Sequence, residues 1–243
     1  MKIALASEPI KNGDIDFNLR SITDCMKKCS KKADLVLFGE SVLQGFDALC
    51  WDYEKDKQVA VELSDARILK IRGCAKECGL AVSFGFIERV KDSLYSTQIF
   101  IGKDGEIVNV FHRVSVGWKE YTMTDEHYVE GNSFERFRYE GKSFAIGLCG
   151  DLWTDGRPEE MKRLGVDIVL WPVWCNYISD EWESTVKGEY AAQAGLCGDN
   201  VLLVNPCCVD TEEIDTGGAV YFKDGAVIEE LPFNQRGCII VEV

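Results

Sequence analysis

The stretch FAIGLCGDLW, residues 144–153, is an apolar run that ends in a thiol and a tight turn. Phe144–Leu148 suits a buried strand, and Gly150 and Asp151 follow Cys149 directly. A strand that delivers a side chain into a sharp turn at a sheet edge leaves that side chain within reach of a small molecule. The pattern indicates a nucleophilic thiol at Cys149, with a buried core thiol as the alternative.

A second apolar run, Leu35–Gly39, ends in Glu40. The carboxylate therefore follows its strand much as the thiol of Cys149 follows its own. If the two strands lie side by side, the acid and the thiol meet, and Glu40 can act as a base. The alternative for Glu40 is an ordinary surface carboxylate after a strand.

Strand and helix patterns alternate along the rest of the chain without a low-complexity linker, which predicts one domain over residues 1–243. Mixed crossover units and hairpins favour an α/β fold in which two mixed sheets pack face to face with helices outside. The expected strands are Lys2–Ala6, Leu80–Ile87, Tyr95–Ile101, Glu106–Phe111, Phe134–Tyr139, Ser143–Cys149, Asp167–Trp171, Val201–Asn205, Ala219–Phe222, Val227–Leu231 and Cys238–Val243, and the expected helices are Phe17–Lys31, Val61–Cys78, Pro158–Leu164 and Thr185–Cys197.

The composition excludes several classes of partner. Lys and Arg total 27 against 41 Asp and Glu, a formal net charge of −14, which argues against binding nucleic acid or anionic lipid. No apolar run approaches the ~20 residues of a membrane span. The N-terminal segment meets an acid at Glu8, too early for a signal peptide, so we expect a cytoplasmic protein.

Eleven cysteines raise the question of a metal site. Cys25 and Cys29, and likewise Cys74 and Cys78, have the i, i+4 spacing that can present two sulfurs on one helix face. However, paired Cys-x-x-Cys clusters are absent and the chain has only two histidines. The sequence therefore predicts no metal site, and most of these thiols are expected to be packing residues.

Several short stretches stand out in order along the chain. They are Leu35–Glu40 with Gly45-Phe46, Gly85–Glu88, Tyr95-Ser96 and Gly141–Asp151, followed more weakly by Trp182, Asn200, Asn205 and Gly217-Gly218. Together, from the first strand to the last, they resemble the nitrilase superfamily of carbon-nitrogen hydrolases.

The resemblance implies a four-layer αββα sandwich, a homodimer and a Glu-Lys-Cys triad. It assigns Cys149 as the nucleophile and Glu40 as the base, acting on a small linear amide or carbamoyl compound through a thioester, with a nitrile as a less favoured substrate. This chemistry needs no cofactor, and no glycine-rich phosphate loop follows the first strand.

The chain departs from the family at the third member of the triad. Where the family usually has Tyr-Arg-Lys, this chain has Phe111-His112-Arg113. Arg113 can donate to a developing oxyanion but cannot give up a proton. A second hypothesis is that Lys119 folds back to supply the amine; a solvated surface lysine is its alternative.

Further residues are expected around the triad. Glu120, or otherwise Glu126, is a candidate for the extra carboxylate that many family members use to position substrate. Trp153, Trp174, Cys175 and Tyr177 follow strand ends on the side where Cys149 should open, so they are candidates for the pocket wall, although each also suits core packing.

Two functions follow from this pattern. A thiol amidohydrolase is favoured because Glu40 and Cys149 are both present. A small-molecule binding or scaffolding protein is the alternative, since Arg113 departs from the triad. A redox-responsive protein is supported only by the number of thiols.

Overall fold

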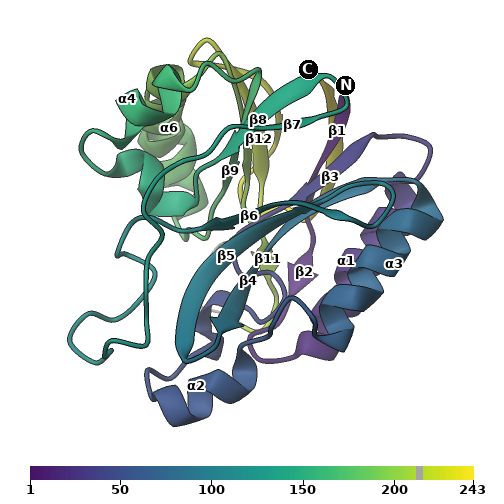
Figure 1. Ribbon diagram of the computed structural model, residues 1–243. Helices are drawn as coiled ribbons and strands as arrows, with labels where there is room; N and C mark the ends of the chain where they lie inside the picture. Colours follow the sequence, from purple (N-terminus) through teal and green to yellow (C-terminus); the bar gives the residue numbers. More distant parts are fainter. Residues whose placement is uncertain (212–215) are drawn as a thin grey trace.

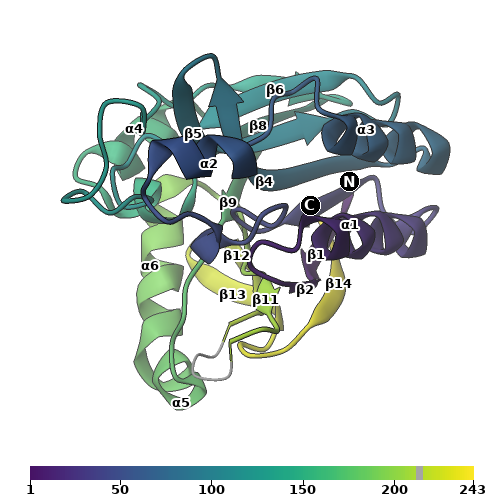
Figure 2. The same ribbon diagram turned by 90° about the horizontal axis from the view of Figure 1, so that it is seen from below.

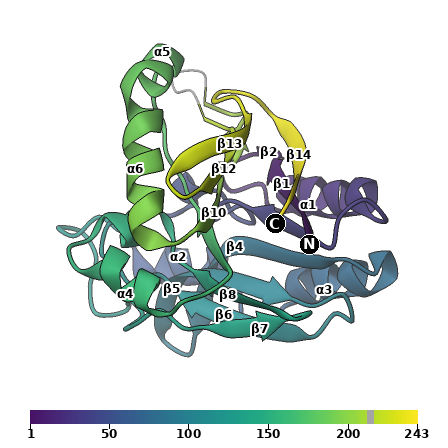
Figure 3. The same ribbon diagram turned by 90° about the horizontal axis from the view of Figure 1, so that it is seen from above.

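The computed structural model describes residues 1–211 and 216–243, which form two six-stranded sheets packed face to face between helices. The first sheet has the order β14-β1-β3-β4-β5-β6 and the second β13-β12-β10-β9-β8-β7. Helices α1 and α3 cover the outer face of the first sheet, and α4 and α6 flank the second (Figure 1, Figure 3). The predicted αββα sandwich of two mixed sheets is confirmed.

The strands of the first sheet are β1 (Lys2–Ser7), β3 (Leu35–Phe38), β4 (Ala81–Val90), β5 (Ser93–Ile101), β6 (Ile107–His112) and β14 (Gly237–Glu242). Those of the second are β7 (Phe137–Tyr139), β8 (Lys142–Ile146), β9 (Ile168–Pro172), β10 (Asn200–Val204), β12 (Ala219–Lys223) and β13 (Ala226–Leu231). Each sheet has three central parallel strands, β1-β3-β4 and β8-β9-β10, with antiparallel strands on both sides. Two short strands, β2 (Pro9–Ile10) and β11 (Cys207–Cys208), pair separately in parallel.

The helices are α1 (Ile15–Cys29), α2 (Tyr53–Val59), α3 (Ala66–Cys78), α4 (Arg157–Arg163), α5 (Ser179–Glu181) and α6 (Lys187–Cys197). Short 3-10 turns span Phe46–Ala48 and Cys149–Trp153, and a π-helical turn, Trp182–Val186, joins α5 to α6. Within the described residues, none of the helices combines the length and the apolar character that a membrane crossing requires.

The alternation of side chains along the parallel strands explains the layers. Leu35 and Leu37 of β3 join the core between the sheets, whereas Val36 and Phe38 join the core under α1 and α3. Successive side chains of a strand point to opposite faces, and helices cover the outer face, so both sets are buried. This is why the central strands have uninterrupted apolar sequences.

The ends of the chain lie side by side (Figure 1). The amino group of Met1 donates to the carbonyl of Val243 at 2.7 Å, and β1 pairs with β14 along its whole length. The last strand, β14, thus forms one edge of the first sheet and lies beside the first strand, β1.

Two expectations about local structure are wrong, and one helix has no counterpart in the sequence analysis. The strand expected to reach Cys149 ends at Ile146, because the chain leaves the sheet and turns into the 3-10 segment. The helix expected from Val61 begins at Ala66, because Asp65 caps it by accepting from the Arg67 amide, and Val61 instead bridges to β4. Helix α2 was not predicted at all, since its polar sequence YEKDKQV carries little hydrophobic periodicity.

The strands that lead to the two site residues do not lie side by side. β3 leads to Glu40 and belongs to the first sheet, while β8 leads to Cys149 and belongs to the second. Glu40 and Cys149 therefore come together across the sandwich rather than along one sheet. The amide of Glu40 donates to the carbonyl of Val173, just beyond β9, at 3.2 Å, which ties the two sheets together at this end.

Candidate active site

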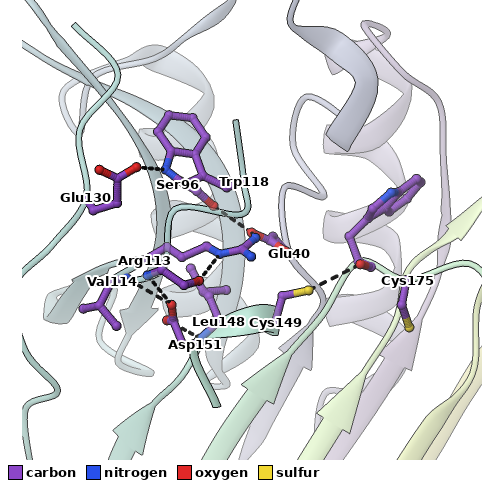
Figure 4. Close-up of polar contacts among 12 residues, drawn as sticks. Glu40, Ser96, Arg113, Val114, Trp118, Glu130, Leu148, Cys149, Asp151 and Cys175 are labelled. Carbon is purple, nitrogen blue, oxygen red and sulfur yellow. Dashed lines mark hydrogen bonds and ion pairs between the residues drawn. The ribbon is translucent and has the colours of Figure 1, made fainter. Parts of the chain in front are cut away.

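Cys149 opens the turn after β8 in a strained backbone conformation. Its φ is +43°, in the left-handed region that non-glycine residues seldom adopt. The indole Nε1 of Trp171 donates to its carbonyl at 3.0 Å, and its Sγ lies 3.4 Å from the carbonyl oxygen of Trp174. The turn holds the sulfur near Glu40 and Arg113, as Figure 4 shows.

Asp151 fastens this turn to the chain that follows β6. Its buried carboxylate accepts from the amides of Leu148 at 2.9 Å, Val114 at 3.0 Å and Ser115 at 2.7 Å (Figure 4). Burial raises the pKa of Asp151 to about 6, although the charge of Arg113 opposes that rise. The carboxylate therefore fixes the loop that carries Arg113 relative to the turn that carries Cys149.

Glu40 is fully buried beyond the end of β3. Its Oε1 accepts from the hydroxyl of Ser96 at 2.9 Å and from Nη1 of Arg113 at 2.8 Å. Its Oε2 is buried and has no hydrogen-bond partner among the described residues. A buried carboxylate oxygen without a donor is uncommon in a folded protein, and here it leaves one oxygen available to accept a proton.

The backbone of the first sheet crowds closely around Glu40. A Cβ placed on Gly85 of β4 would lie 2.8 Å from the Cα of Glu40 and 2.4 Å from the amide nitrogen of Ser41. Position 85 therefore requires a glycine so that the chain carrying the carboxylate can lie against β4.

Arg113 is also buried and links the other two residues electrostatically. Its Nε donates to the hydroxyl of Ser115 at 2.9 Å, which orients the plane of the guanidinium. Burial alone would lower the pKa of Arg113, but Glu40 and Cys149 raise it, so the side chain remains a cation. Conversely, burial and then the charge of Glu40 raise the pKa of Cys149 to about 11, while Arg113 opposes this rise.

Gly150 makes room for the arginine. A Cβ at this position would lie 2.8 Å from Nη2 of Arg113 and 3.5 Å from the hydroxyl of Ser115. Real Cβ atoms essentially never approach another heavy atom so closely, so a larger residue at 150 would push the guanidinium away. Arg113 and Gly150 thus fit each other, and the pattern of the sequence alone did not reveal this dependence.

The structure does not bring Lys119 to the triad. Its amine donates to the carbonyl of Tyr128 at 2.5 Å and lies 2.8 Å from Oε1 of Glu130. The same oxygen of Glu130 accepts from the indole of Trp118 at 3.1 Å. The ammonium is therefore held in the loop after β6, with no contact to Glu40, Arg113 or Cys149 among the described residues.

The two candidate carboxylates of that loop also lie apart from the triad. Glu120 and Glu126 are exposed, and Oε1 of Glu120 accepts from the hydroxyl of Thr122 at 3.1 Å. Glu130 belongs to a part of the loop that is tied to Arg113, because the next residue, Gly131, donates its amide to the carbonyl of Arg113 at 2.8 Å. No motif distinguished Glu130 in the sequence.

A cavity of about 530 Å³ opens beside the sulfur. Trp153, Trp174, Cys175 and Tyr177, which the sequence predicts for the pocket wall, all line it. Trp174 has a packing role as well, since its ring stacks on Phe46 at 5.5 Å. The other lining residues are Cys149, Gly150, Asn176, Glu189 and Tyr190.

Asn176, Glu189 and Tyr190 were not predicted as pocket residues. Asn176 lies between two predicted wall residues in the sequence, so its neighbours could have indicated its place in the wall. Glu189 and Tyr190 belong to α6, which lies far from Cys149 in the sequence, so no local pattern indicated that they line the cavity.

The chain belongs to the carbon-nitrogen hydrolase family, whose profile matches residues 2–243. It is 35% identical over 205 residues to an arylacetonitrilase of Hypocrea virens, covering 74% of this chain and 59% of that protein. It is 24% identical over 172 residues to a glutamine-dependent NAD(+) synthetase of Acinetobacter baylyi, covering 70% of this chain and 30% of the synthetase. The chain thus spans about one third to three fifths of the length of these curated relatives.

A crystal structure of an amidase from Nesterenkonia sp. has the same fold. It superposes with a TM-score of 0.79 at 21% identity, over 100% of this chain and 90% of the amidase. In that amidase, a Glu-to-Gln variant shows covalent addition of the acetamide moiety of fluoroacetamide at the active-site cysteine.

Proposed function

We propose that this protein hydrolyses a carbon-nitrogen bond of a small linear amide or carbamoyl compound through a thioester on Cys149. The observation that carries the proposal is the meeting of a buried carboxylate, a buried guanidinium and a strained cysteine turn beside one cavity. Family membership supports the same chemistry.

The first half of the reaction forms the thioester. Because the pKa of Cys149 is raised to about 11, the resting residue is a thiol, so proton loss accompanies attack. Glu40 takes the proton on its Oε2 while the sulfur bonds to the substrate carbonyl carbon. Arg113 donates to the oxygen that becomes negative. As the carbon-nitrogen bond breaks, Glu40 returns the proton to the departing amine or ammonia.

The second half releases the acid. Glu40 removes a proton from water, the resulting oxygen attacks the thioester carbonyl, and the carbon-sulfur bond breaks. The proton then passes back to the sulfur of Cys149. Arg113 stays protonated throughout, since a guanidinium beside a carboxylate has no means of acting as a base, and Glu40 carries every proton.

The pocket favours neutral or cationic substrates over anionic ones. Among the described residues that line it, Glu189 alone is charged at neutral pH, and the rest of the wall is largely aromatic. A negative substrate group would be repelled by this carboxylate and by the net charge of −14.

The charge preference is tested with amides that have the same length and differ only in the charge of the end remote from the amide group. The cationic amide should have the higher kcat/KM, and Glu189→Gln should reduce the preference by up to about fivefold, whereas Glu181→Gln, outside the cavity, should leave it intact.

The central experiment measures ammonia release from simple amides, N-carbamoyl compounds and nitriles, together with the intact mass of the protein during turnover. Activity with an acyl adduct on the Cys149 peptide is the expected result. No product from any substrate, together with no acyl adduct on the Cys149 peptide, would overturn the proposal.

The alternative function is a small-molecule binding or scaffolding protein. One observation favours this function. Nη1 of Arg113 donates to Oε1 of the proposed base, Glu40, at 2.8 Å, so that oxygen is already engaged by a cation. In that case amides should bind in calorimetry without release of ammonia, and Arg113→Lys should generate activity that the natural chain lacks.

We further propose that residues 1–243 act as one carbon-nitrogen hydrolase domain, in a homodimer in the cytoplasm, with a small molecule as the principal partner and neither nucleic acid nor membrane. The family resemblance supports the dimer, the absence of a low-complexity linker supports one domain, and the acidic composition argues against nucleic acid and anionic lipid as partners. Light scattering on the purified chain tests the dimer, and fractionation of the producing cells tests the location.

A further inference from the structure

Three thiols meet far from the candidate active site, between α1 and β14. Cys25 and Cys29 lie one turn apart on α1, and Cys238 lies on β14, the edge strand beside β1 (Figure 2). The three sulfur atoms all lie within 4.8 Å of one another, and Sγ of Cys29 is 3.7 Å from Sγ of Cys238. Cys25 and Cys29 are buried, while Cys238 is half-buried. This is the one group of three potential metal ligands among the described residues.

The spacing suits a tetrahedral thiophilic ion. Zinc binds thiolate sulfur at about 2.3 Å, so two sulfurs on one zinc ion lie about 3.8 Å apart. The cluster therefore needs only small side-chain adjustments to bind such an ion. A donor set made entirely of sulfur selects soft or borderline ions such as zinc and cadmium over magnesium or calcium.

Two basic side chains lie near the cluster. The charges of Lys32 and Lys28 act on Cys29. Metal-bound cysteines are thiolates, so nearby ammonium groups suit an ion held by sulfur ligands. The two lysines also offset the net negative charge of three thiolates around a divalent ion.

We propose that Cys25, Cys29 and Cys238 form a binding site for Zn²⁺, with the fourth coordination position open at the half-buried Cys238 side. The ion joins α1 to the last strand and so stabilises the contact between the two ends of the chain. The site is separate from the triad, and its existence does not depend on the proposed hydrolase activity.

A natural control exists within the same chain. Cys74 and Cys78 repeat the i, i+4 spacing on α3 with their sulfurs 3.9 Å apart, but no third ligand among the described residues completes the pair. If spacing on a helix were sufficient, both pairs would bind metal equally. If the tertiary cluster is required, only the α1–β14 group binds.

The experiment uses the full-length protein, reduced and kept anaerobic, in equilibrium dialysis against Zn²⁺ and in titration with Cd²⁺, which reports thiolate ligation by its ultraviolet charge-transfer band. We expect one tightly bound ion per chain and a rise in the melting temperature. Cys238→Ala and Cys25→Ala should lose the band, the ion and the thermal shift, whereas the double variant Cys74→Ala/Cys78→Ala and the variant Cys149→Ala should keep all three.

Two results would overturn the proposal. One is Zn²⁺ binding that Cys238→Ala leaves unchanged, or that the Cys74→Ala/Cys78→Ala variant abolishes. The other is a reduced wild-type chain that binds no ion, in which case peptide mapping after mild oxidation would reveal whether Cys29 and Cys238 form a disulfide instead. Cys238→Ala alters a half-buried edge residue, so a normal unfolding transition in that variant excludes misfolding as the cause of the loss.

Discussion

Two ion pairs involve the chain segment that follows β6, with the same separation between nitrogen and oxygen but different surroundings. Arg113 lies 2.8 Å from Glu40, and Lys119 lies 2.8 Å from Glu130. The side chains of the first pair are 3% and 0% exposed, against 10% and 20% for the second. Among the described ion pairs, the first lies beside the turn that carries Cys149 and Gly150, whereas the second is held within its own loop. Distance within an ion pair is therefore a poor guide to function; burial and the third group beside the pair decide it.

The comparison also separates the two cations that the sequence left open. Arg113 donates to Glu40, whereas Lys119 donates to the carbonyl of Tyr128 within its own loop. Changes at the two pairs should then have very different consequences for activity.

The largest effect is expected from Glu40→Gln. Removing the base should lower kcat/KM by about 10²- to 10⁴-fold, the usual contribution of general-base catalysis. The labelling of Cys149 should change in the opposite direction. Burial and the charge of Glu40 raise the pKa of Cys149 to about 11, so without that charge the pKa falls and more thiolate is present at pH 8.

Iodoacetamide kinetics between pH 7 and 10 measure this shift. The wild-type rate should climb about tenfold per pH unit across the range, because the pKa lies above it, whereas the Gln variant should level off earlier. An unchanged labelling profile would show that Glu40 does not act on the sulfur.

The next effect concerns Arg113→Met, which removes the cation while keeping an unbranched side chain. Loss of an oxyanion donor typically costs about 10²- to 10³-fold in kcat, and we expect a fall of that order with a smaller change in KM. Steady-state kinetics on the best amide provide the measurement. Full activity in this variant would remove Arg113 from the mechanism and reopen the case for Lys119.

Gly150→Ala should have an intermediate effect that depends on Arg113. The new methyl group would lie 2.8 Å from Nη2 of the guanidinium, so we expect about a tenfold loss of kcat/KM. In the Arg113→Lys background the same substitution should cost much less, because an ammonium has no Nη2. A double-mutant cycle over the four proteins measures the coupling, and additive effects would refute it.

The smallest effect is expected from Lys119→Met. Because its amine contacts Tyr128 and Glu130 rather than the triad, kcat should stay within about threefold of the wild type. The free energy of unfolding should fall by about 1 kcal/mol through loss of the partly buried pair. Denaturant unfolding measures this loss, and Glu120→Gln on the exposed part of the loop is the matched control. A collapse of activity with normal stability would contradict the placement of Lys119 outside the site.

Much of the fold could be predicted because local patterns carry it. The apolar runs at residues 35–39 and 144–148, the hairpin turns and most helices lie where periodicity indicated, and the two-sheet sandwich is confirmed. Local reasoning failed at α2 and at the start of α3, where polar capping contacts, rather than an apolar stripe, set the element.

For the site, the sequence identified the residue types but not all of their partners. Glu40 and Cys149 follow recognisable strand ends, and the four predicted wall residues do line one cavity. The sequence assigned no role to Ser96, Ser115 or Gly150, because each is placed by a contact with Arg113 or Glu40 that a local pattern does not reveal.

The sequence by itself determined which faces of the strands are buried and where the thiol and the carboxylate leave them, since alternation of apolar residues is a local property of the backbone. Only the tertiary structure decided which sheet each strand joins, that Arg113 meets Glu40 across 73 residues, and that Cys238 meets Cys29 across 209. The periodicity of apolar residues predicts that a strand face is buried, but it does not predict which element packs against that face. Contacts between distant segments follow from how the two sheets pack, and that depends on the whole core at once.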